Sequence, residues 1–174
     1  MATLFVDKID PQSGTSLTIG SSGDTVALGS GVVQSNLNNP SFLAYKSSQQ
    51  TISNNTTTKV TFDTELFDSN NTFADSRFTP GVAGKYLMTA VVSMTNHPSG
   101  AYVGIYPYKN GSSLYSELTY NGTSGDADTR VSATLIVDLN TTDYLEIYTR
   151  QNAGQNENTR SSYEVRFMAQ RIGS

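Results

Sequence analysis

The chain of 174 residues contains no cysteine and no tryptophan, and it has a single histidine, His97. The absence of cysteine excludes disulfide bonds, catalytic thiols and cysteine-based metal sites. It also favours folding in a reducing compartment, because small secreted domains usually carry disulfides. A Ser-His-Asp triad would have to use His97, which stands in a polar segment without a nucleophile motif. We therefore predict no enzyme and interpret His97 as a solvated loop residue.

Charge is also scarce: charged residues make up 15% of the chain, and the net charge is −4 at pH 7. No basic cluster is present, which argues against a nucleic-acid partner. No apolar run approaches the roughly 20 residues that a membrane-spanning helix needs, so we predict no membrane insertion. Residues 1–8 lack the basic start and the long apolar stretch of a signal peptide.

Alternating apolar and polar residues predict β-strands through most of the chain, and no helical period of useful length is present. The sequence Asn110-Gly111 predicts a tight hairpin, because both residue types accept a positive φ. The fold class is therefore all-β. The strands are expected at 42–46, 57–66, 84–95, 101–109, 112–120, 130–139, 143–150 and 161–172.

Residues 76–90 carry the most informative pattern of the chain. They include Phe78-Thr79-Pro80, a glycine six residues after Phe78, and then the alternating Tyr86, Met88 and Ala90. The segment resembles the signature strand of the complement-type globular heads, which share the jelly roll of tumour necrosis factor (TNF) and form compact trimers. The resemblance implies a TNF-like jelly-roll β-sandwich that assembles as a homotrimer. Three upstream residues fit the same pattern, with five and four residues between them: Phe62, Asp68 and Phe73.

A repeat distinguishes the N-terminal part. Residues 14–20 recur nine positions later as residues 23–29, each copy with two apolar residues on one face. Strands this small are not stable alone, so their apolar side needs the same segment of other copies of the chain. Residues 6–14 resemble the entry to phage fibre stalks, which are intertwined triple-stranded β structures. A disordered tail is the alternative. The predicted packing residues of the stalk are Leu17, Ile19, Val26 and Leu28.

These patterns divide the chain into three parts. Residues 1–35 are predicted to form a trimeric β stalk that attaches to a virion. Residues 36–40 form a linker, because they contain three asparagines before Pro40. Residues 41–174 form the jelly-roll head.

Tyrosines and amides supply the candidate receptor contacts. Tyrosine combines an apolar ring with a polar tip, and amides both donate and accept hydrogen bonds, as sugar hydroxyls require. Sheet packing of the tyrosines and a plain solvent loop are the alternatives. The candidates are Tyr102, Tyr106, Tyr108, Gln151, Asn152, Gln155 and Asn156. Three further tyrosines are assigned to core or subunit packing: Tyr86, Tyr144 and Tyr148.

Two acidic pairs are candidate sites. Asp63 and Glu65 share one strand face, but a glycosidase pair needs a companion motif, so we interpret them as a solvated face. Asp126 and Asp128 are weak candidates for calcium ligands, because the full calcium-loop pattern is missing. A plain Asx-stabilised loop is the alternative, and no other cofactor is predicted.

The sequence thus favours a trimeric fibre or appendage protein of a bacteriophage, located in the virion. Its expected partners are other virion proteins, through the N-terminus, and a host cell-surface polysaccharide or protein, through the head. A tail fibre and a capsid-surface fibre fit equally well. The alternatives are a purely structural capsid decoration protein and a free trimeric lectin or ligand of the complement-head type.

Overall fold

The structure is a computed structural model that describes residues 9, 11, 13–14, 17–25, 30, 39–115 and 127–173. Contacts divide the chain into two units, residues 1–37 and 38–174. Within the described residues all regular elements are β-strands, which confirms the all-β prediction. This part of the chain accordingly has no helix able to cross a bilayer.

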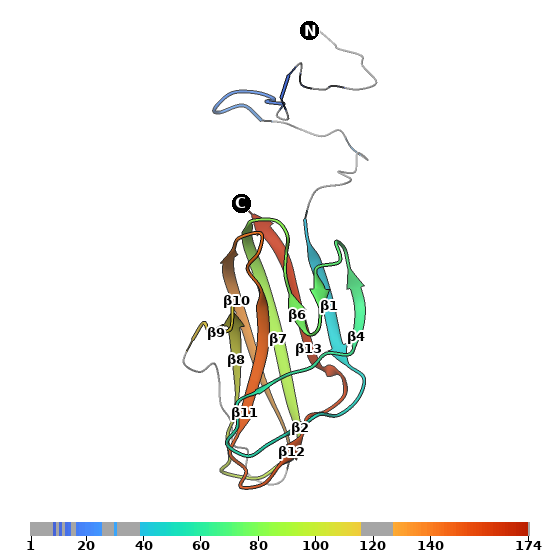
Figure 1. The fold of residues 1–174 in the computed structure, drawn as a ribbon, viewed down its shortest axis with the longest axis vertical. Coiled ribbons are helices and arrows are strands. Elements are labelled where there is room, and N and C mark those ends of the chain that lie inside the picture. The colour runs from blue at the N-terminus through green and yellow to red at the C-terminus, as the bar shows by residue number, and fades with distance from the viewer. Residues whose placement is uncertain are drawn as a thin grey trace. The chain divides into compact units, whose positions relative to one another are not determined.

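The first layer of the second unit is a five-stranded antiparallel sheet (Figure 1). Strand β7 lies next to the edge strand β10 and is paired with it along its whole length. Strand β13 joins β7 to β1, so the last strand of the chain lies between two early ones. The order across the sheet is β10 (Ala127–Leu139), β7 (Gly84–His97), β13 (Ser162–Gly173), β1 (Ser41–Lys46) and β4 (Thr64–Asp68).

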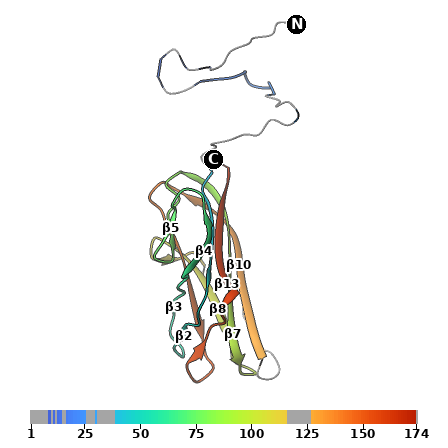
Figure 2. The same ribbon diagram turned by 90° about the vertical axis from the view of Figure 1, so that its right-hand side faces the viewer.

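The second layer is a six-stranded sheet that faces the first, as the edge-on view in Figure 2 shows. Its main path is β5 (Phe73–Ala74), β6 (Arg77–Phe78), β11 (Leu145–Gln151), β8 (Val103–Lys109) and β9 (Ser112–Ser113), and β3 (Thr58–Lys59) also pairs with β11. A small two-stranded sheet joins β12 (Glu157–Asn158) to β2 (Thr51–Ile52).

The core lies between the two layers and is rich in phenylalanine. The Phe42 ring stacks on Phe73 and Phe78, with centroids 4.5 and 4.8 Å away, and meets the edge of Phe167 at 4.9 Å. Phe42, Phe78 and Phe167 are fully buried. Aromatic pairs in these geometries contribute beyond their buried area, so this cluster anchors both sheets to each other.

The prediction of one strand over 57–66 is wrong. The Val60 amide donates to the Ile147 carbonyl of the six-stranded sheet at 2.8 Å, whereas the Asp63 amide donates to the Tyr45 carbonyl of the five-stranded sheet at 3.2 Å. The chain therefore crosses from one sheet to the other, with Val60 and Phe62 buried on the way. The two-residue strands β2, β5, β6 and β12 were not predicted, because two residues show no periodicity. Of the predicted strand 112–120, residues 116–120 lie outside the described part.

Two glycines account for patterns seen in the sequence: Gly111 in a tight turn and Gly84 at the start of β7. Asn110 and Gly111 have φ values of 52° and 77°, which confirms the predicted tight hairpin between β8 and β9. Gly84, the glycine of the complement-head pattern, has a φ of 150°. A Cβ atom at this position would lie 2.3 Å from the Gly173 carbonyl oxygen. Glycine is required there because the backbones of β7 and β13 approach each other closely.

The interpretation of His97 as a solvated residue is wrong. Strand β7 extends to His97, and the side chain is fully buried. Its Nδ1 atom contacts Oε2 of Glu157, which is itself 5% exposed. Glu157 belongs to β12, so a strand that sequence patterns do not reveal covers the histidine.

The first unit is described in part, and it shows one turn. Between the two repeats, the Asp24 amide donates to the Ser21 carbonyl at 3.0 Å, and the Asp24 carboxylate accepts from the Ser21 amide at 2.6 Å. Leu17 and Ile19 are 46% and 65% exposed, and residues 17–25 form no strand in the single chain. Val26 and Leu28 lie outside the described residues, so the stalk stays a prediction.

Candidate functional site

The outer face of the six-stranded sheet carries a tyrosine platform, made of Tyr106 and Tyr108 from β8 and Tyr148 from β11. Tyr106 stands opposite Tyr148 in the register, and the rings of Tyr108 and Tyr148 lie 4.1 Å apart between centroids. The residues that precede Tyr106 and Tyr148, Ile105 and Ile147, are fully buried in the core. Strand alternation therefore directs the half-buried tyrosines outward.

A buried carboxylate adjoins the platform. Glu146 is 4% exposed, and its Oε1 atom accepts from Lys59 Nζ at 2.7 Å and from Arg77 Nη2 at 3.0 Å. Burial alone would raise the pKa of Glu146, but the hydrogen bonds from Lys59 and Arg77 outweigh it and lower the pKa. The Arg77 guanidinium also lies over the Tyr144 ring, 3.8 Å from its centroid. The guanidinium is thereby held by an ion pair and by a cation–π contact.

The ionised Glu146 acts on the neighbouring phenol of Tyr148. Burial, and after it the negative charge of Glu146, raise the pKa of Tyr148. The Tyr148 hydroxyl stands 3.5 Å from Glu146 Oε2 and is placed to donate to it. The Tyr148 phenol is therefore kept in its neutral form and oriented by the buried carboxylate.

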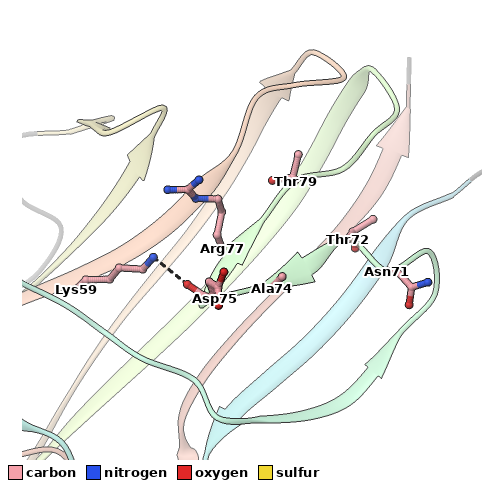
Figure 3. A pocket seen from close by; sticks show the side chains of 7 residues that line it. All are labelled: Lys59, Asn71, Thr72, Ala74, Asp75, Arg77 and Thr79. Atoms are coloured by element: carbon pink, nitrogen blue, oxygen red, sulfur yellow. Dashed lines mark hydrogen bonds between the residues drawn. The ribbon is translucent and has the colours of Figure 1, made fainter.

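A pocket of about 440 Å³ opens beside this carboxylate (Figure 3). Its volume lies in the range of small-molecule sites. Its lining combines donors and acceptors, and Lys59 Nζ donates to the Asp75 carbonyl at 2.9 Å. The lining residues are Lys59, Asn71, Thr72, Ala74, Asp75, Arg77 and Thr79.

The predicted receptor residues divide between two places. Tyr106 and Tyr108 belong to the platform, whereas Tyr102 precedes β8 and lies beside the loop after β11. The Tyr102 amide donates to Asn152 Oδ1 at 2.6 Å, and the Asn152 amide returns a bond to the Tyr102 carbonyl at 3.1 Å. Asn152, Gln155 and Asn156 are exposed on this loop.

Gln151 does not share the exposure of its neighbours, because it is fully buried. Its Nε2 atom donates to the carbonyls of Ile52 and Gln155 at 3.0 and 2.8 Å, and its Oε1 accepts from the Ala153 amide at 2.6 Å. The side chain therefore holds the loop in shape, and it is not on the surface offered to a receptor. A buried amide of this kind cannot be told from an exposed one by sequence.

Of the three tyrosines predicted to pack in the core or between subunits, one lies in the core and two lie outside it. Tyr86 is fully buried beside Phe78, and its hydroxyl donates to the Val82 carbonyl at 2.8 Å. Tyr144 and Tyr148 lie outside the core, on the outer face of the six-stranded sheet, and a role in subunit packing stays a prediction for them. Sequence reasoning missed Lys59, Arg77 and Glu146. Glu146 could have been found by its alternation with the buried Leu145 and Ile147, but the two cations come from distant strands.

Asp63 shapes a turn. Its Oδ1 accepts from the Ser47 amide at 2.6 Å, and its Oδ2 accepts from the Ser48 hydroxyl at 2.9 Å. Burial would raise the pKa of Asp63, but the hydrogen bonds from Ser47, Ser48 and Thr64 outweigh it and lower the pKa to about 2. The carboxylate thus stabilises the segment after β1.

A pH-dependent loss of stability follows for Asp63→Asn. The folded pKa lies below the ordinary value of 3.8, so the carboxylate stabilises the fold above about pH 4, and this contribution is lost as the pH falls through about 2. We expect the variant to lose about 1 kcal/mol at pH 7, since solvent screens this exposed group. Urea unfolding from pH 7 to pH 2 measures the difference, with Glu65→Gln as the control. A difference that stays constant over this range would contradict the prediction.

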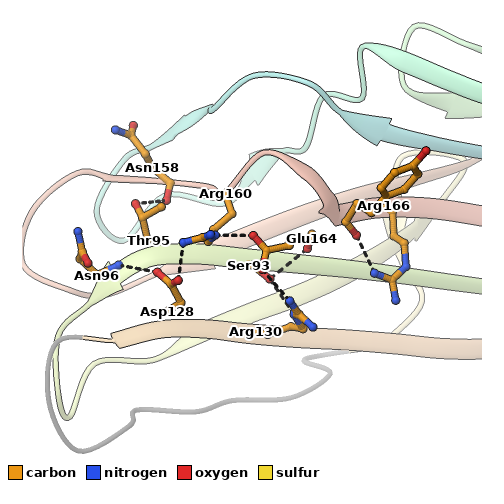
Figure 4. A network of polar contacts seen from close by, with 10 residues as sticks. Ser93, Thr95, Asn96, Asp128, Arg130, Asn158, Arg160, Glu164 and Arg166 are labelled. Atoms are coloured by element: carbon orange, nitrogen blue, oxygen red, sulfur yellow. Dashed lines mark hydrogen bonds and ion pairs between the residues drawn. The ribbon is translucent and has the colours of Figure 1, made fainter.

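Asp128 takes part in a network of ion pairs at the edge of the five-stranded sheet (Figure 4). Its Oδ2 atom pairs with Arg160, and its Oδ1 accepts from the Asn96 amide at 3.3 Å. Arg160 also pairs with Glu164, which in turn accepts from Arg130 at 3.0 Å. Within the described residues no group of three or more acidic or histidine side chains is placed to hold a metal ion. Asp126 lies outside these residues, so the calcium site stays a prediction.

Comparison of structures identifies the fold of the head. No protein-family model matches the chain, and no curated protein matches it in sequence. The globular domain of zebrafish complement 1qA aligns with a TM-score of 0.51 and 20% identity, covering 75% of this chain and 94% of that domain. Murine APRIL gives a TM-score of 0.57 at 11% identity, over 77% of this chain and 99% of its own.

The Eiger TNF of S. frugiperda is similar as well, with a TM-score of 0.51 at 10% identity, over 78% of this chain and 92% of its own. Identities this low carry the fold and nothing more. The predicted fold is confirmed: the described residues of the second unit, 39–115 and 127–173, build an all-β sandwich with the jelly roll of the complement heads and the TNF-type proteins.

Proposed function

We propose that the protein is a homotrimeric fibre or appendage protein of a bacteriophage virion. Residues 1–35 form the threefold stalk and attach to other virion proteins, and the jelly-roll head forms a knob. The knob binds a polysaccharide or protein of the host cell surface. The protein is a binding and structural component, not an enzyme.

One observation carries the trimer: the outer face of the five-stranded sheet bears a group of apolar side chains, three of which are well exposed in the single chain. We call it the apolar face; it consists of Leu43, Phe67, Leu87, Ile136 and Met168. Phe67, Leu87 and Ile136 are 47%, 39% and 62% exposed. Leu43 stands between Phe67 and Met168 in the register, and Leu87 stands opposite Ile136. An exposed apolar patch on a sheet marks an interface, and we take other copies of this chain as the molecules that cover it.

The N-terminal repeat supports the same assembly independently. Leu17 and Ile19 are exposed in the single chain, where residues 17–25 form no strand. Such side chains become buried when the segments of three copies wind around one axis. The resemblance of residues 6–14 to phage fibre stalks is what directs the proposal to a virion.

The mechanism follows from valency. One trimer presents three equivalent sites, and one particle presents many trimers, so weak single contacts add up through effective concentration. The low content of charged residues, 15%, makes such attachment tolerant of salt.

Two other assignments share this architecture. A capsid decoration protein would keep the trimer without binding cells. A free trimeric ligand is favoured by the likeness of the head to murine APRIL and to an insect TNF, and it would not need residues 1–35 to dock on a particle.

Deletion of residues 1–35 tests the proposal. We expect light scattering to give three chains for the full-length protein and a trimer that dissociates more readily for the shortened protein, because the stalk ties the heads together. Fluorescent full-length protein should coat at least one strain in a broad panel of bacteria, and the shortened protein should coat it less.

The outcomes separate the assignments. A full-length protein that is monomeric at micromolar concentration overturns the proposal. A trimer that coats no strain while it binds virus particles assigns the protein to capsid decoration.

A further inference from the structure

The pocket beside Glu146 is held by a rigid frame. Asp75 and Ser76 form the turn of the β5–β6 hairpin with φ values of 50° and 59°. Ser76 is 7% exposed, and its hydroxyl accepts from the Phe62 amide at 2.8 Å. Opposite the hairpin, the Asp68 carboxylate accepts from the Thr72 hydroxyl and from the Phe73 amide, both at 2.8 Å. Both walls of the pocket are therefore set before any ligand arrives, which reduces the entropy cost of binding.

The charges of the pocket are balanced. Lys59 and Arg77 supply two cations to its lining, the buried Glu146 accepts from both of them, and Asp75 adds a second carboxylate. A site with balanced charges has no net field to attract an anion or a cation. It offers fixed donors and acceptors side by side, an arrangement that fits adjacent hydroxyl groups, since each hydroxyl donates and accepts.

The tyrosine platform continues the pocket. Glu146 contacts Lys59 and Arg77 on one side and stands next to the Tyr148 hydroxyl on the other. Tyr108 and Tyr148 present half-buried rings with their polar tips, which suits contact with the apolar face of a sugar ring. A chain of sugar units can therefore enter the pocket with one unit and lie on the platform with the next.

We propose that the pocket between Lys59, Asp75 and Arg77 binds one unit of an uncharged saccharide, with the adjoining unit on the tyrosine platform. The inference rests on the proposed function and names the ligand class of the knob. The site lies on the six-stranded sheet, whereas the apolar face lies on the five-stranded sheet. Each head of a trimer therefore keeps its pocket open to the outside.

Saturation-transfer NMR on the full-length protein tests the inference. The probes are the methyl glycosides of glucose, galactose, mannose, rhamnose and N-acetylglucosamine, with glucuronate and N-acetylneuraminate as acidic probes. We expect at least one neutral glycoside to bind weakly and in competition with its own oligomer.

Two variants place the binding in the pocket. Asp75→Asn removes an exposed charged acceptor and suits the positive φ of the turn. Ala74→Phe adds a ring at a lining residue that is not itself a member of the ion pairs of Glu146. Each is expected to weaken the neutral glycoside about tenfold or more. Glu65→Gln, which removes an exposed carboxylate of β4, is the control and should bind as the unchanged protein does.

The inference is overturned if no neutral glycoside binds, if only the acidic probes bind, or if the two pocket variants bind as well as the control. The mass and the cell coating of the same preparations are measured in parallel. Pocket variants that coat cells normally overturn the inference and leave the proposed function standing. A monomeric protein whose sugar binding is lost in both variants supports the pocket and overturns the proposed function.

Discussion

Replacing Phe42 with alanine is expected to lower the free energy of unfolding by about 3–5 kcal/mol. The ring is fully buried and stacks on Phe73 and Phe78 while it meets the edge of Phe167. These three partners come from both sheets, so the cavity left by the ring would stand at the centre of the sandwich and could not collapse easily. Urea unfolding at one protein concentration measures the loss, since the stability of an oligomer depends on concentration.

Two variants control for the size and the position of the lost ring. Phe42→Leu keeps most of the volume and should cost less than about 2 kcal/mol. Tyr115→Ala removes a ring that is 50% exposed, and it should change the stability by no more than about 0.5 kcal/mol. Equal losses for Phe42→Ala and Tyr115→Ala would show that the phenylalanine cluster is not the centre of the core.

Charging the apolar face is expected to abolish the association of the heads. Leu87 and Ile136 stand opposite each other on β7 and β10, and they are 39% and 62% exposed. In a trimer that uses this face, Leu87→Asp with Ile136→Asp would bury two carboxylates per chain without partners, and each such burial costs several kcal/mol. In a protein shortened to residues 39–174, we expect the double variant to be a monomer by light scattering, with the mass falling threefold.

The shortened protein without substitutions should remain a trimer, although a weaker one than the full chain. Tyr115→Asp provides the matched control, because it also replaces an exposed apolar side chain with a carboxylate but lies on the hairpin after β9. If the double variant keeps the mass of the unsubstituted protein, the apolar face is not the interface. Circular dichroism should show an unchanged β spectrum in all three proteins, because none of the changes touches the core.

Assembly and ligand binding would then use opposite sides of one sandwich. The apolar face lies on the outside of the five-stranded sheet, and the pocket with the tyrosine platform lies on the outside of the six-stranded sheet. Substitutions on one side are therefore expected to leave the other unaffected, because sites this far apart act additively. The variants at Asp75 and Leu87 thus report on separate properties.

The sequence predicts the long elements well. Strands β1, β7, β8, β10, β11 and β13 were all expected, because each alternates apolar and polar residues over several positions. The pattern around Phe78 and Gly84 also indicated the jelly roll, and the close approach of Gly84 to the Gly173 carbonyl gives one physical reason for that pattern. The alternation of apolar residues and the residue types of turns can be recognised in short stretches of the chain, because they do not depend on which strands pack together.

The sequence predicts poorly whatever depends on contacts between distant strands. It gave no sign that residues 57–66 cross between sheets, that β12 covers His97, or that Gln151 turns inward to hold its loop. Each of these follows from a partner more than 40 residues away or in the other layer. A two-residue strand has no period of its own and exists only because a neighbour supplies its hydrogen bonds.

The sequence by itself determined an all-β head with a jelly-roll order of strands, a separate N-terminal repeat, and a surface poor in charge. Only the tertiary structure decided which polar side chains meet: it joined Lys59 of β3 and Arg77 of β6 to Glu146 of β11, and it set this cluster beside Tyr108 and Tyr148. The physical reason is that alternation along a strand tells which face a side chain takes. The pairing of strands, which brings three distant segments to one carboxylate, is set by the packing of the whole sandwich.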